Sequence, residues 1–325
     1  IFHKKIIFIH YIFTFIFFPF VLILESQKSC IDIGSSPRSF DILLDEVKLN
    51  NEEYQKKARK VYLKTAMFHF LSERSNFYKK TISNLNFFSN KKIKEFNEYL
   101  ENKNIYLNKG SWFVCIHARE DFAEDDYRSN KFENYLQVCD FINDNGGKVI
   151  RLGKNLNPLE NKNIISLENK NCNNFLLNLF LINSSKIFIS TASGPSSVCN
   201  LLIKTPQIQA NSILESAPCG IQNTYMPNMI LDKKKDQIIP ASKYWNYYYS
   251  YHHKIHENYK VIKSSSDEIT NAFKYKLNEI ESKKFTNDQQ FEWKKSFGKN
   301  SYYRFIKSKV DPLFYQKYFD SFFNK

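Results

Sequence analysis

Two short polar segments carry residues suited to binding an anion, and each directly follows an apolar run. The first reads His117-Ala-Arg119-Glu120-Asp121, and the second begins at Ser190 and reads Ser-Thr-Ala-Ser-Gly-Pro-Ser-Ser. Arginine can grip a phosphate with two parallel N–H bonds, and loop carboxylates such as Glu120 and Asp121 can act as general bases. A strand end with a surface arginine is the structural alternative for the first segment.

The second segment combines hydroxyl groups with the start of a helix. Ser190 and Gly194 belong to a run of small residues that would let the backbone approach a ligand, and Thr191 and Ser193 add hydroxyl groups. Proline fits the first helical turn, so the N–H groups near Ser196 and the positive end of the helix favour an anion. No Gly-Lys-Ser/Thr follows, which excludes a P-loop, and GxGxxG is absent. A well-capped, buried helix is the alternative.

Alternating strands and helices are expected to position both segments. Gly146-Gly147 should end one of these helices. Strands are predicted at 112–117, 148–151, 163–166, 186–190 and 207–210, and helices at 132–145, 174–183 and 196–203. This order predicts a doubly wound α/β domain with a parallel sheet, whose ligands bind beyond the carboxyl ends of the strands. Two loops at that edge, one with an arginine and one with a helix start, suit the diphosphate of a nucleotide-sugar.

The regions on either side differ in character. Ile6–Leu24 has nineteen residues without a formal charge after two lysines, which predicts a membrane anchor. A signal peptide and a buried segment of a truncated domain are the alternatives. Helices are expected within 26–104, one of them capped by Ser89, and 212–260 should be rich in loops. A capping box at Ser265 opens a helix to about 282, and the aromatic, basic tail 283–325 should pack on the core as helices or lie on a membrane surface.

Composition narrows the class of protein. The 325 residues are 42% hydrophobic with a net charge of +14, which is globular and excludes wholesale disorder and coiled coil. The charge attracts polyanions, but no nucleic-acid recognition module is visible, and a solvated basic surface is the simpler interpretation. The six cysteines form no CxxC pair and no zinc spacing, so we expect buried free thiols, a reducing compartment and no metal site.

Five segments resemble a family of bacterial glycosyltransferases common in surface-polysaccharide gene clusters and distantly similar to the GT-B fucosyltransferases. They are WFVCIHARE, YRSN with ENY, GGKVIRLG, IFISTASGPSSV and TPQIQAN, within Leu85–Ile280. His117 and Arg119 match the family's H-x-R signature, which implies that Arg119 grips the donor diphosphate. Glu120 stands where those enzymes usually have a second arginine. The residues that match the donor loop are Ser190, Thr191, Ser193 and Gly194.

The resemblance also implies an organisation and a reaction. Residues 105–282 would be the nucleotide-sugar-binding domain, and 26–104 a reduced or truncated acceptor-side domain. The protein would move a sugar from a nucleotide diphosphate to a glycan or lipid-linked glycan. The predicted anchor would make it membrane-associated, and no nucleic-acid partner is expected. No D-x-D motif is present, so we expect metal independence and no cofactor. Asn211 ends the last matching strand, and Arg128 either binds phosphate or pairs with Glu133. The alternative is a non-catalytic, membrane-tethered protein that binds anionic glycan or lipid.

Overall fold

The computed structural model describes residues 88–120, 130–153, 163–167, 174–196, 199, 205–212, 222–241, 258–283 and 308–323. The predicted anchor Ile6–Leu24 and the predicted helices before residue 88 lie outside these ranges. Within them, no helix is both long enough and apolar enough to cross a bilayer.

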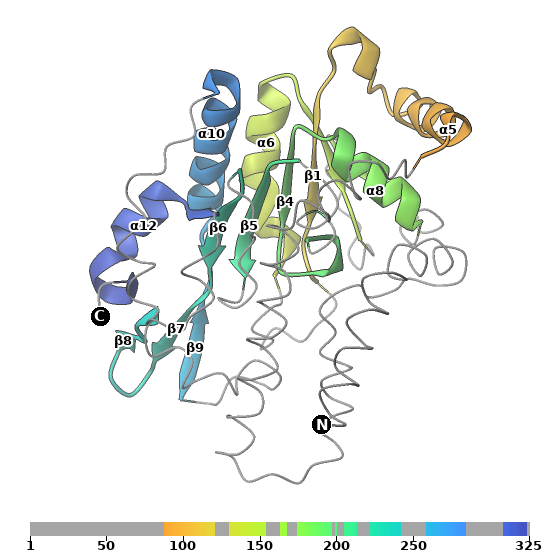
Figure 1. Cartoon of the computed structure of the whole chain (residues 1–325). Coiled ribbons are helices and arrows are strands. Elements are labelled where there is room, and N and C mark those ends of the chain that lie inside the picture. Colours follow the sequence, from red (N-terminus) through yellow and green to blue (C-terminus); the bar gives the residue numbers. More distant parts are fainter. Residues whose placement is uncertain are drawn as a thin grey trace, which may run out of the picture.

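A seven-stranded sheet with parallel pairing throughout forms the centre of the described structure (Figure 1). Its strands are β1 (Phe113–His117), β2 (Lys148–Arg151), β3 (Ile164–Ser166), β4 (Ile187–Ser190), β5 (Gln207–Ser212), β6 (Thr224–Pro227) and β10 (Lys309–Val310). Phe113 pairs with Lys148 in parallel register. The predicted parallel α/β sheet is therefore confirmed.

The strands lie in the order β10-β6-β5-β4-β1-β2-β3. Without β10 this is the Rossmann order, in which the chain builds outward from β1 in one direction and then returns to continue on its other side. The reversal lies between β1 and β4. In open sheets of this kind, the crevice beyond the carboxyl ends of the two strands at the reversal is where ligands bind.

Helices cover both faces, as predicted. The described helices are α5 (Asn90–Glu101), α6 (Leu136–Asp144), α8 (Phe175–Ser184), α10 (Ser266–Ser282) and α12 (Pro312–Tyr318). Residues of β1 alternate between two apolar clusters: Val114 joins the cluster that includes α6, α10 and α12, and Phe113 the one that includes α5 and α8. Figure 1 shows α6 and α10 on one side of the sheet and α8 on the other. Strand β1 is therefore buried on both faces, which explains its continuous apolar sequence.

Local signals fix several element ends where the sequence predicted them. The Ser89 hydroxyl accepts from the Lys92 N–H and caps α5, and Ser265 and Glu268 form the predicted capping box of α10. Gly146 has a φ of +76°, which suits glycine after α6. The predicted helix 132–145 is divided: a 3₁₀ turn, η2 (Phe132–Tyr135), precedes α6.

The prediction that 212–260 is loop-rich is wrong for its described part. β6 belongs to the main sheet, and β7 (Met229–Asp232), β8 (Gln237–Ile238) and β9 (Tyr259–Ile262) form a separate antiparallel sheet. The described part of the predicted tail, 308–323, packs on the core, which is one of the two alternatives expected for it: Phe314, Phe322 and Phe323 are buried. The prediction missed β10, and it missed the π-helical turn η6 (Phe319–Phe323) and the 3₁₀ turn η1 (Leu107–Lys109).

Candidate functional site

The two predicted polar segments meet at the strand-order reversal. His117, the last residue of β1, pairs in register with Ser190, the last residue of β4. The Thr191 N–H donates to the His117 carbonyl at 3.1 Å and extends the pairing one residue beyond the strands. The parallel sheet thus brings His117, Ser190 and Thr191 together at the edge where its fold class binds ligands.

His117 is partly buried and lies in an electropositive environment. Burial and the nearby Arg119 charge lower the pKa of His117 to about 4, so its imidazole is neutral at pH 7. Its Nδ1 is buried and has no hydrogen-bond partner among the described residues. Gly153, with a φ of +103°, lies against the ring: a Cβ there would be 3.3 Å from the imidazole Cδ2 and Nε2. A glycine lets the chain after β2 approach the imidazole this closely.

Both carboxylate oxygens of Glu120 bond to residues of the protein. Its Oε1 accepts from the Phe132 N–H at 3.0 Å, and its Oε2 is ion-paired with Arg151. Arg151 is 1% exposed, and its guanidinium lies over the Phe132 ring, 4.5 Å from the centroid. Arg119 is half-buried, and its carbonyl accepts from the Asn130 N–H at 2.9 Å. Arg119 is therefore tied to Asn130 through its backbone, and Glu120 is tied to Phe132 and Arg151 through its side chain.

Two further predicted site residues, Asp121 and Arg128, lie outside the described ranges. The predicted helix start after β4 is present, since Gly194–Ser196 and Cys199 are helical. The Ser193 hydroxyl accepts from the Ser196 N–H at 3.4 Å and caps this helix. That N–H, expected to face an anion, is thus already used by the cap. The Thr191 Oγ1 is buried and has no partner within the described part of the chain.

Beneath this edge, four polar side chains form a buried network that joins β4, β5 and the helix that begins after β4. Gln207 Nε2 donates to Ser190 Oγ at 2.7 Å and to Ser196 Oγ at 2.6 Å. Ser196 Oγ in turn donates to Gln209 Oε1 at 2.7 Å. All four residues are at most 2% exposed. Gln207 and Gln209 were not among the predicted site residues. Two glutamines on either side of Ile208, at alternate positions of a short strand, are the signal that could have found them.

Asn211, a predicted donor-binding residue, is buried and bonds to neighbouring segments of the protein. It is fully buried with a φ of +52°, at an irregularity in the pairing of β5 with β6. Its Oδ1 accepts from the Ser264 N–H at 2.6 Å, and its carbonyl accepts from Asn228 Nδ2 at 3.3 Å. Asn211 therefore ties the end of β5 to the segments before α10 and after β6.

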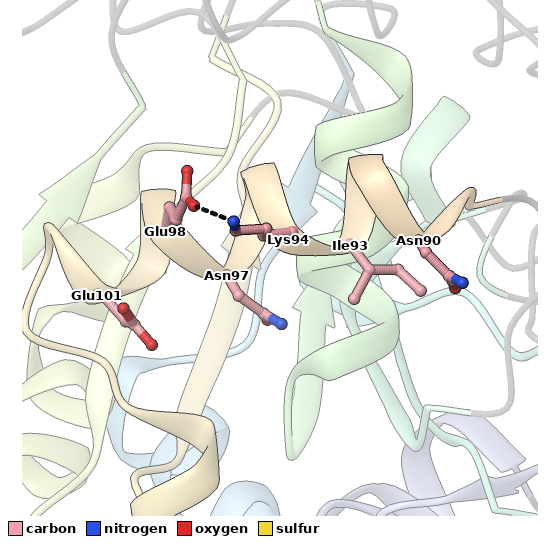
Figure 2. A pocket seen from close by; sticks show the side chains of 6 residues that line it. All are labelled: Asn90, Ile93, Lys94, Asn97, Glu98 and Glu101. Atoms are coloured by element: carbon pink, nitrogen blue, oxygen red, sulfur yellow. Dashed lines mark ion pairs between the residues drawn. The ribbon is translucent and has the colours of Figure 1, made fainter.

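The described residues contain no group of three or more His, Cys, Asp or Glu side chains that could hold a metal. Cys115, Cys139 and Cys199 are buried and free, and burial raises the pKa of each thiol, which disfavours the thiolate a nucleophile needs. A hollow of about 450 Å³ lies along α5 (Figure 2). The described residues that line it all belong to α5, and Lys94 and Glu98 among them are paired across a turn at 4.0 Å. Figure 1 shows α5 away from the carboxyl ends of the strands.

Comparison of the chain with protein-family models, with curated proteins and with solved structures finds no match in any of the three. The residues and their geometry are therefore the basis for assigning a function.

Proposed function

We propose that this chain is a glycosyltransferase that binds the diphosphate of a nucleotide-sugar at the carboxyl edge of β1 and β4. The observation that carries the proposal is the register pairing of His117 with Ser190 at the reversal of a Rossmann-like strand order. Arg119 supports it further, because its charge acts on the His117 imidazole and so lies close to the same edge. A diphosphate needs cationic and hydroxyl donors from two sides, and these are the groups the two strand ends supply.

The chemistry follows from where charge develops. The bond between the anomeric carbon and the diphosphate oxygen breaks, and its electron pair leaves with the diphosphate. An acceptor hydroxyl forms the new bond to the anomeric carbon and loses its proton to a base. Negative charge therefore grows on the leaving group, where Arg119 and the strand-end hydroxyls stabilise it. Glu120 has both oxygens engaged, so it positions the loop, and Asp121 is the carboxylate proposed as the base.

The resemblance to glycosyltransferases of surface-polysaccharide clusters supports a glycan or lipid-linked glycan as the acceptor. The net charge of +14 is compatible with anionic diphosphate donors and with a membrane surface that carries such acceptors.

The experiment is a donor screen on the full chain, followed by substitution of Arg119. Thermal shifts are measured with GDP-, UDP-, ADP- and CMP-sugars, where a ligand at 100 times its Kd adds about 2.7 kcal/mol of stability. Arg119→Ala should weaken donor binding roughly 10- to 150-fold, the range for one charge-assisted bond of about 1.5–3 kcal/mol, and transfer should fall further. Arg119→Lys should also be impaired, because an ammonium lacks the planar fork.

Lys94→Ala is the matched control. It removes one cation from the exposed face of α5, where its side chain is 81% exposed. It should leave donor binding and transfer unchanged. Full transfer by Arg119→Ala would refute the assignment of the site. Affinity for anionic glycans or lipid vesicles, with no response to any nucleotide-sugar, would instead favour the non-catalytic binding protein.

A further inference from the structure

The buried network leaves two groups without a partner among the described residues: the hydrogen of the Ser190 hydroxyl and the Oε1 of Gln207. The Gln207 amide has two hydrogens, one directed to Ser190 Oγ and one to Ser196 Oγ. Ser196 accepts that bond and gives its own hydrogen to Gln209 Oε1. Ser190 also accepts from Gln207, but no described residue accepts the hydrogen of its hydroxyl. Because the Gln207 amide donates to one lone pair of Ser190 Oγ, the hydrogen of the Ser190 hydroxyl remains available to a ligand.

Other polar atoms at the same edge also have hydrogen-bonding capacity that the described residues do not use. They are His117 Nδ1, opposite Ser190 in the sheet register, and Thr191 Oγ1, one residue further along. Thr191 is fully buried, and Ser190 beside it is buried as well. Buried polar groups are nearly always paired in native proteins, so several such atoms within one strand end indicate that a polar ligand completes them. The positive charge of Arg119 near His117 makes an anion the favoured ligand.

We propose that Gln207 is a positioning residue that presents the Ser190 hydroxyl as a hydrogen-bond donor to a phosphoryl oxygen bound at the ends of β1 and β4. The identity of that phosphoryl group as the diphosphate of a nucleotide-sugar rests on the proposed function. Gln207 does not touch the ligand; it acts through Ser190 by donating to one of the two lone pairs of the hydroxyl oxygen. A glutamine is suited to this task because its amide donates to two hydroxyls at once.

Burial has a consequence for how the ligand arrives. Ser190 and Thr191 are fully buried in this structure, so a phosphoryl oxygen can contact them only after local opening at the sheet edge. The apparent affinity is then the intrinsic affinity reduced by the fraction of open molecules. Once bound, the contact is shielded from water, which strengthens a hydrogen bond to an anion.

The test is a double-mutant cycle on pyrophosphate binding, measured by calorimetry with the full chain. Gln207→Met and Ser190→Ala should each weaken pyrophosphate binding by roughly 10- to 150-fold, the range for one hydrogen bond to a charged group. The double variant should bind no more weakly than Ser190→Ala, because Gln207 acts through the Ser190 hydroxyl. Additive losses would overturn the proposal, as would unchanged binding in Ser190→Ala.

Thr205→Val is the matched control, because it deletes a buried hydroxyl bond two residues before β5 begins. Thr205 Oγ1 donates to the Ile182 carbonyl at 2.8 Å, away from the strand end. It should lower thermal stability and leave pyrophosphate affinity unchanged. If Gln207→Met does not fold, Gln207→Glu takes its place. Its carboxylate would accept the Ser190 hydrogen, so Ser190→Ala should have no further effect on binding in that background, whereas a further 10-fold loss would overturn the proposal.

The outcomes separate this proposal from the proposed function. Coupled loss of pyrophosphate binding with no sugar transfer from any donor supports the role of Gln207 and refutes the glycosyltransferase. Sugar transfer together with additive effects at Gln207 and Ser190 supports the glycosyltransferase and refutes the role of Gln207. Failure of the unmodified chain to bind pyrophosphate overturns the role of Gln207, whatever the transfer assay gives.

Discussion

Replacing Glu120 by alanine should destabilise the fold strongly, because it leaves the buried Arg151 guanidinium without its carboxylate. Arg151 is 1% exposed, and the Glu120 side chain is 10% exposed. Breaking one side of a buried ion pair typically costs about 3–5 kcal/mol, since the remaining charge is poorly solvated. The variant also loses the acceptor for the Phe132 N–H, which begins η2. We therefore expect a loss at the upper end of that range.

The assay is urea unfolding of the full chain, followed by circular dichroism, together with calorimetry. At about 2–4 °C per kcal/mol for a chain of this class, the melting temperature should fall by roughly 6–20 °C. The double variant Glu120→Leu/Arg151→Met should recover most of the loss, because it buries no charge. Glu281→Ala, which breaks the exposed pair with Lys186, is the control and should change stability by less than about 1 kcal/mol.

Two results would contradict this reasoning. A loss below about 1 kcal/mol for Glu120→Ala would mean that the pair does not hold the loop. Normal stability of Glu120→Gln combined with abolished sugar transfer would return Glu120 to the role of general base.

Three further predictions concern packing and pH. Gly147→Ala should destabilise by about 1–3 kcal/mol in urea unfolding, because its Cβ would lie 2.5 Å from Trp112 Cη2, and Trp112→Leu in the same chain should relieve the loss. Burial raises the pKa of Asp311 to about 6, so the folded state binds more protons than the unfolded state between pH 4 and 6. Stability should fall as pH rises through that window, by up to about 1.4 kcal/mol per unit, and Asp311→Asn should remove the slope. Burial lowers the pKa of Lys276 to about 8, so stability should rise between pH 8 and 10.5, and unfolding of Lys276→Met should show no such rise.

The sequence predicts the elements whose signals are local. The strand at 112–117, the stop at Gly146-Gly147 and the strand at 148–151 follow from apolar runs and a glycine C-cap, and the structure has all three. The strands within Thr224–Asp232 were not predicted, because Pro227 and Asn228 are residues that normally interrupt strands. Here they mark the point where the chain leaves the main sheet as β6 and enters the small sheet as β7. β10 has two residues, too few for any periodicity.

The sequence likewise predicts only those features of the candidate site that follow from local signals or general rules. The proximity of His117 and Ser190 follows from a general rule about the carboxyl ends of parallel strands, and the structure pairs them. The partner of Glu120 could not be predicted, because Arg151 lies 31 positions away on a strand that reads as buried. The role of Asn211 depended likewise on Ser264, a long-range backbone partner.

Strand β10 ties the completion of the fold to the last part of the chain. Lys309 and Val310 pair with Thr224 and Tyr225, so the edge of β6 has no neighbour during synthesis until residue 310 has been made. Domains emerging from the ribosome expose such unpaired edges and apolar surface to aggregation. A chain that stops before residue 308 would also lack the buried aromatic rings of α12 and η6. A molecule that lacks the segment 308–323 would therefore expose the edge of β6, a feature that chaperones and proteases would recognise.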